Sequence, residues 1–157
     1  MRTLIYSSAV AVALAFAVPI SADYASAHTG FSPHIDGAVQ FPPTRWRIVR
    51  HTIRLHLPQG SSPLSQLIID VPEGLTVSNN ITINDNLGRK VIANFSVTDN
   101  KIIVNFSQPI ASESELKLNL NNVKRRGISN AWIYQFSAKF VGVNVAIPIG
   151  TARIRVY

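Results

Sequence analysis

The histidines offer the most specific chemistry in this sequence. If a signal peptidase cuts after Ala27, the mature chain begins at His28, whose free amine and ring nitrogen can together hold one metal ion. Amine and imidazole nitrogens suit copper(II). A second imidazole would complete a histidine brace, and the residues that could donate it are His34, His51 and His56. We therefore take His28 and His34 as candidate copper ligands, although His34 also fits an ordinary loop.

Arginines form the second candidate site. The predicted anion-binding residues are Arg45, Arg47, Arg50, Arg54, Arg153 and Arg155, to which the run Lys124-Arg125-Arg126 can add in the fold. The chain carries 15 Lys and Arg against 8 Asp and Glu, a formal net charge of +7. This balance favours an anionic partner: an acidic polysaccharide, an anionic lipid headgroup or an acidic protein of the envelope or lumen. The alternative is that the arginines keep exposed strands soluble and protect sheet edges.

The sequence lacks the motifs of the common enzyme classes. It contains no G-x-S-x-G elbow, P-loop, H-E-x-x-H motif or EF-hand calcium loop, and its acidic residues are scattered rather than paired for acid–base work. There is no cysteine, which excludes disulfides, thiolate metal sites and a cysteine nucleophile. We expect no enzymatic activity, with a copper-dependent oxidant as the one alternative. Nucleic acid is a disfavoured partner, because export separates the protein from it.

The first residues have the plan of a secretory signal peptide. Arg2 precedes an apolar run over residues 4–18, and small residues end in Ala25-Ser26-Ala27. An apolar run of about 15 residues is shorter than the roughly 20 needed to cross a bilayer. We predict a signal peptide over 1–27, an N-terminal arm or loop over 28–44, and one domain over 45–157 without a transmembrane segment. The periplasm, the cell surface and the thylakoid lumen are the expected compartments.

Alternating apolar and polar residues predict an all-β domain. Val49, Ile53, Leu55 and Leu57 share one parity with Arg50 and Arg54 on the other, and the same period recurs in later segments. The strongest case is the row of Trp132, Tyr134, Phe136, Ala138 and Phe140. About eight strands separated by Pro, Gly and Asn turns indicate an antiparallel β-sandwich of immunoglobulin-like architecture, with a closed barrel as the alternative.

Several short motifs resemble a known family. They are Pro43-Thr44-Arg45, the run Leu57-Pro58-Gln59-Gly60-Ser61-Ser62-Pro63-Leu64, Tyr134-Gln135-Phe136-Ser137-Ala138, and the ending Gly150-Thr151-Ala152-Arg153-Ile154-Arg155-Val156-Tyr157. Together they resemble the cyanobacterial exported proteins that carry domain of unknown function 2808. The resemblance implies a cyanobacterial source and export, and it supplies no catalytic residues. The N-terminal His28 lies outside the family's pattern.

Overall fold

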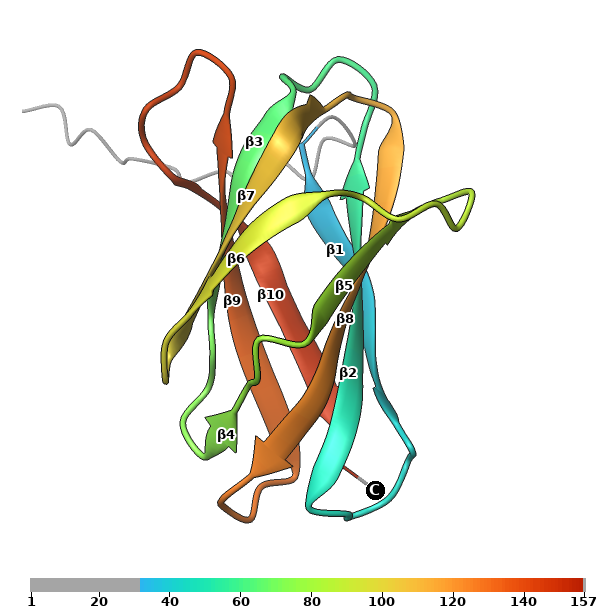
Figure 1. Cartoon of the computed structure of the whole chain (residues 1–157), viewed down its shortest axis with the longest axis vertical. Coiled ribbons are helices and arrows are strands. Elements are labelled where there is room, and N and C mark those ends of the chain that lie inside the picture. Colours follow the sequence, from blue (N-terminus) through green and yellow to red (C-terminus); the bar gives the residue numbers. More distant parts are fainter. Residues whose placement is uncertain (1–31, 157) are drawn as a thin grey trace, which may run out of the picture.

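The computed structural model describes residues 32–156, whose regular structure consists of β-strands (Figure 1). The strands are β1 (His34–Phe41), β2 (Ile48–Leu57), β3 (Leu64–Asp70), β4 (Leu75–Thr76), β5 (Ile81–Asp85), β6 (Ala93–Val97), β7 (Lys101–Ile110), β8 (Ser114–Arg125), β9 (Ala131–Phe140) and β10 (Ile147–Arg155). Among residues 32–156 there is no helix of the length and apolarity that a membrane crossing requires.

The strands form two antiparallel sheets that pack face to face (Figure 1). The first sheet has the order β1-β2-β8, and the short strands β4 and β5 both pair with the far side of β8. The second sheet has the order β10-β9-β3-β7-β6. The edge strands β1 and β10 contact each other along one side of the molecule. The fold is therefore the predicted β-sandwich of immunoglobulin-like architecture.

Strand alternation places the core as the sequence predicted. Both the apolar row of β2 and the aromatic row of β9 are buried between the sheets, whereas Arg50, Arg54 and Ile133 face outward. Burying one large apolar side chain stabilises the fold by roughly 2 to 3 kcal/mol. The facing rows thus supply a large driving force for bringing the two sheets together.

Residues 32–156 form ten strands rather than about eight, because two strands have weak sequence signals. Strand β1 lies inside the segment 28–44, which we predicted to be an arm or loop, and that prediction is wrong for residues 34–41. Its side chains show no clean alternation, and its register with β2 shifts between Ile35 and Gly37. Strand β4 is two residues long and is defined by its pairing with the end of β8. Both strands are therefore defined by backbone pairing with a neighbouring strand, and not by an alternating apolar pattern.

A β-bulge in β8 changes which of its side chains face the core. Val49 of β2 pairs with Val123, whereas the next pair joins His51 to Leu120, so β8 holds an extra residue here. Asn122 lies in the bulge and has a φ of 56°, a left-handed conformation that asparagine tolerates. Beyond the bulge the buried parity switches, and Arg125 faces inward. The basic run Lys124-Arg125-Arg126 is thus divided, since Lys124 and Arg125 belong to β8 and the turn begins only after Arg125.

Candidate anion-binding surface

Two arginines of β2 lie against β1 on the outer face of the first sheet. Arg50, Arg54 and Lys117 of β8 line a hollow of about 360 Å³ together with residues 37–41. Gly37 makes room for one of them, since a Cβ at this position would stand 3.2 Å from Nη2 of Arg54. The guanidinium carbon of Arg50 lies 5.1 Å from the centre of the Phe41 ring, a cation–π contact. Both guanidinium groups are thereby held beside β1.

Two further arginines lie on the other side of the same strand. Arg153 and Arg155 project from β10 and line a second hollow, of about 310 Å³, with residues 38–40 and Pro43. Residues 38–40 of β1 belong to both hollows. Strand β1 is therefore flanked by positive charge on both sides. We call this set the β1 arginine surface: Arg50, Arg54, Lys117, Arg153 and Arg155.

No carboxylate of residues 32–156 forms an ion pair with the β1 arginine surface. The ion pairs in this part of the chain are His34–Asp36 (3.0 Å), Arg89–Asp85 (2.7 Å) and Lys101–Asp70 (3.5 Å). Asp36 belongs to β1 itself, but its carboxylate is directed to the His34 ring. The positive charge around β1 is thus available to a partner, because no nearby carboxylate neutralises it within the described structure.

The structure divides the six predicted arginines between two places. Arg45 and Arg47 do not join the β1 arginine surface, because they lie in the loop that connects β1 with β2. There they line hollows with Lys124, Arg125 and Arg126. Sequence reasoning grouped all of these residues by charge alone, whereas the strand order separates them.

Both ring nitrogens of His34 face oxygen atoms. Nδ1 lies 2.9 Å from the Ser32 carbonyl oxygen, and Nε2 lies 3.0 Å from the Asp36 carboxylate. The ring of His56 is its neighbour, with the ring centres 5.2 Å apart. Within residues 32–156 no three His, Asp or Glu side chains are placed to hold a metal ion. His28 lies outside the described residues, so the copper brace stays a prediction, which N-terminal sequencing and copper titration of the mature protein would test.

A buried pair was missed at the sequence level. His51 is fully buried, and its Nδ1 lies 2.7 Å from the hydroxyl of Tyr134 across the core. Burial, assisted by the positive charge of Arg125, lowers the pKa of His51 from 6.5 to about 4, and burial raises the pKa of the Tyr134 hydroxyl. The signal was present, because His51 shares the buried parity of Val49 and Ile53. The pair is enclosed by the two sheets and presents no accessible reactive group.

Comparison with known proteins supports the fold. No protein-family model matches the chain, and no curated protein matches its sequence. Among solved structures, the bacterial hydrophobin BslA is similar over 80% of this chain and 94% of its own, with 18% identity and a TM-score of 0.57. The N-terminal domain of the Streptococcus gordonii adhesin Sgo0707 is similar over 80% of this chain and 32% of its own, with 10% identity and a TM-score of 0.56. At such identities the likeness shows a shared β-sandwich, and the resemblance to the cyanobacterial family stays a prediction.

Proposed function

We propose that this protein is an exported, non-enzymatic binding module that holds an anionic partner on the β1 arginine surface. The observation that carries the proposal is the placement of Arg50, Arg54, Arg153 and Arg155 on both sides of β1 without a carboxylate partner among residues 32–156. Arginine presents a planar set of donors that matches carboxylate, sulfate and phosphate oxygens. A surface of this kind attracts anions and orients them.

The shape of the surface favours a partner with repeated charges. Its two hollows lie on either side of residues 38–40 of β1, so a small ion would engage only one of them. An extended acidic polysaccharide can reach both, as can an acidic segment of an envelope or lumen protein. Phe41 is the one exposed aromatic ring among the residues that line the two hollows, and it is covered in part by Arg50. Single-stranded nucleic acid binds where several exposed rings can stack on its bases, so it fits this surface poorly.

The ionisable groups support a role without catalysis. Strongly shifted pKa values often mark catalytic residues. In the described part of the chain the large shifts belong to His51 and Tyr134, which pair with each other inside the core. Export is supported by the predicted signal peptide over residues 1–27, and the envelope or lumen of a cyanobacterium by the family resemblance.

The proposal predicts binding that depends on charge and salt. Dextran sulfate and a polyuronate should retain the purified mature protein, while neutral dextran should not. Retention should fall steeply as salt is raised, because the charge attraction is screened over about 8 to 10 Å at ordinary ionic strength. Equal retention on neutral dextran, or retention that is insensitive to salt, would contradict the proposed function.

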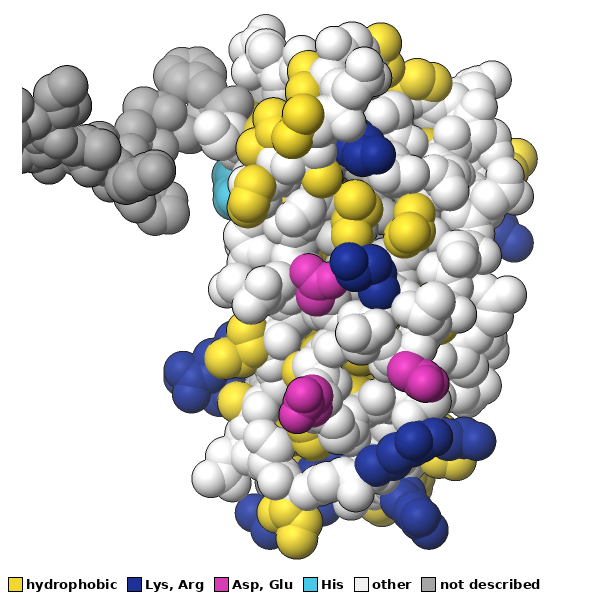
Figure 2. Space-filling model, turned by 90° about the vertical axis from the view of Figure 1, so that its left-hand side faces the viewer, with side chains coloured by type: hydrophobic (Ala, Val, Ile, Leu, Met, Phe, Trp, Pro, Cys, Tyr) yellow, Lys and Arg dark blue, Asp and Glu magenta, His cyan; other side chains and the backbone are white. Residues whose placement is uncertain are grey.

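An exposed apolar segment favours a second candidate function, adsorption to an apolar interface. Val141, Val143 and Val145 of the loop between β9 and β10 are all exposed, as is Ile147, the first residue of β10. Hydrophobic side chains also gather toward the upper end of the face in Figure 2. Exposed apolar clusters of this kind usually mark contact sites. The structural likeness to a bacterial hydrophobin agrees with this candidate.

Replacing two valines of this loop tests that candidate. Val141→Ser/Val145→Ser should slow the rise of surface pressure at an air–water interface, because two exposed apolar side chains no longer leave water on adsorption. Ile92→Ser, at an exposed site before β6, serves as the matched control and should leave the rate unchanged. Identical rates for wild type and the double variant would remove the candidate.

A further inference from the structure

A second concentration of positive charge lies at one end of the sandwich. It consists of residues 45–48, where the chain enters β2, and residues 124–128, where it leaves β8. The two segments are joined by a hydrogen bond in which the Arg125 backbone N–H donates to the Arg47 carbonyl oxygen, at 2.9 Å. We call these two segments the basic pole. They contain five basic side chains and no acidic one: Arg45, Arg47, Lys124, Arg125 and Arg126.

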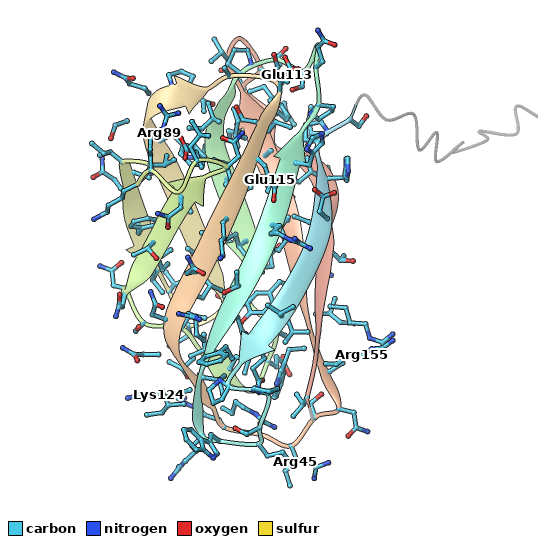
Figure 3. The ribbon with its side chains drawn as sticks, turned by 90° about the vertical axis from the view of Figure 1, so that its right-hand side faces the viewer. Arg45, Arg89, Glu113, Glu115, Lys124 and Arg155 are labelled. Carbon is cyan, nitrogen blue, oxygen red and sulfur yellow. The ribbon has the colours of Figure 1, made fainter. Side chains whose placement is uncertain are left out.

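In the labelled view, the glutamates lie away from the basic pole. Figure 3 shows Arg45 and Lys124 toward one end of the sandwich, and Glu113 and Glu115 toward the other, where Arg89 also lies. Glu73 is an acidic residue adjacent to this end, since the carbonyl oxygen of its neighbour Gly74 accepts a hydrogen bond from the Arg126 backbone N–H. Glu73 makes no ion pair with the described residues. The molecule therefore presents a strongly positive end.

Arg125 is a buried charge beneath this end. The residue is only 9% exposed, and its Nε and Nη1 atoms are enclosed without a hydrogen-bond partner in the described structure. Arg125 and Arg47 together line two adjoining hollows, of about 320 and 270 Å³. A buried guanidinium without a carboxylate destabilises a fold, and its field extends through the low-dielectric protein to the surface. The arrangement favours an anion placed over the hollows.

Exposed apolar side chains surround the same hollows. Trp46 is 65% exposed, Ile48 50% and Ile128 99%, and each lines one of the two hollows beside Arg47 and Arg125. A hydrated polyanion would give these side chains no apolar surface to contact. Tryptophan and aliphatic side chains interleaved with arginine and lysine are typical of segments that lie in the headgroup region of a membrane.

We propose that the basic pole docks on an anionic lipid surface. Arg47, Lys124 and Arg126 contact lipid phosphates, while Trp46, Ile48 and Ile128 enter the headgroup region. Arg125 lies beneath the hollows and adds its unneutralised charge to their potential. The proposal stands apart from the β1 arginine surface, since it uses different residues, and failure of one leaves the other intact.

Vesicle binding and tryptophan emission test the proposal together. The mature protein should bind vesicles of equal parts phosphatidylcholine and phosphatidylglycerol, and should not bind vesicles of phosphatidylcholine alone. The chain has two tryptophans, and Trp132 is already buried, so a blue shift of emission on binding reports Trp46. Arg47→Glu/Lys124→Glu should weaken vesicle binding by about fivefold or more for each basic side chain lost. The control Lys90→Glu/Lys101→Glu, with the same change in net charge beside β6, should retain binding.

Arg125 has its own test. Arg125→Met should weaken vesicle binding about fivefold, because it removes one positive charge, while leaving the urea midpoint of unfolding unchanged or higher. Arg125→Lys should keep the binding. A residue that served the fold alone would show the opposite split, with lower stability and unchanged binding. If Arg125→Met does not fold, the surface variant Arg47→Glu/Lys124→Glu decides the question.

Three outcomes would overturn the proposal. The first is equal binding to neutral and anionic vesicles. The second is displacement of the protein from vesicles by millimolar inorganic phosphate without any blue shift, which would indicate a site for a free anion. The third is loss of vesicle binding in Val141→Ser/Val145→Ser but not in the pole variants, which would place the lipid contact at the opposite loop.

Discussion

Acidification from about pH 6.5 to about pH 4 will lower the free energy of unfolding by about 3 kcal/mol through His51 alone. The unfolded chain takes up a proton on this imidazole below its ordinary pKa of 6.5, whereas the folded chain resists protonation down to a pKa of about 4. The folded state resists because the ring is buried and because the positive charge of Arg125 opposes a second positive charge on it. The contribution of the neutral His51 ring to the free energy of unfolding therefore has its full value above about pH 6.5 and decreases below this pH.

Urea unfolding at a series of pH values measures this effect, and His51→Gln isolates it. The glutamine side chain can donate a hydrogen bond to the Tyr134 hydroxyl or accept one from it, but it has no proton to gain in this range. The variant should be less stable than wild type at pH 7, and the difference between the two proteins should shrink as the pH falls. Parallel curves for wild type and His51→Gln would contradict the buried neutral histidine.

Phe136→Ala will lower the free energy of unfolding by about 3 to 5 kcal/mol, because it leaves a cavity in the tightly packed core. Phe136 is 1% exposed and lies on β9, between β10 and β3 in the second sheet. Ile133→Ala on the same strand removes an outward side chain and should cost about 0.5 kcal/mol or less. Urea titration of both variants at pH 7 gives the comparison. Similar losses at the two positions would contradict the assignment of the buried face.

The fold was largely predictable because strands with one buried face carry a regular signal. In β9, four aromatic residues and Ala138 occupy every second position, so the pattern alone identified both the strand and its inner face. In β1 the alternating signal is absent, because the register of the strand shifts at Gly37. Backbone pairing with β2, rather than an apolar row of side chains, holds β1 in place. Long-range pairing of this kind leaves no local trace in a single sequence.

The candidate site was predictable in composition but not in arrangement. The alternating pattern of β2 correctly predicted that Arg50 and Arg54 face outward. Their proximity to Arg153 and Arg155 depends on the edge strands β1 and β10 meeting, which the sequence does not reveal. The inward position of Arg125 could not be predicted, because the bulge at Asn122 reverses the parity of β8, and one extra residue in a strand cannot be recognised without its partner strand.

The most direct test of the central claim compares two triple charge reversals on immobilised dextran sulfate. Arg50→Glu/Arg54→Glu/Arg153→Glu should weaken retention by about tenfold or more, because it removes positive charge on both sides of β1. Lys90→Glu/Lys101→Glu/Lys139→Glu changes the net charge equally but leaves the β1 arginine surface intact, and it should weaken retention far less. Equal weakening by the two variants would show that net charge alone governs binding, and would contradict a built site around β1.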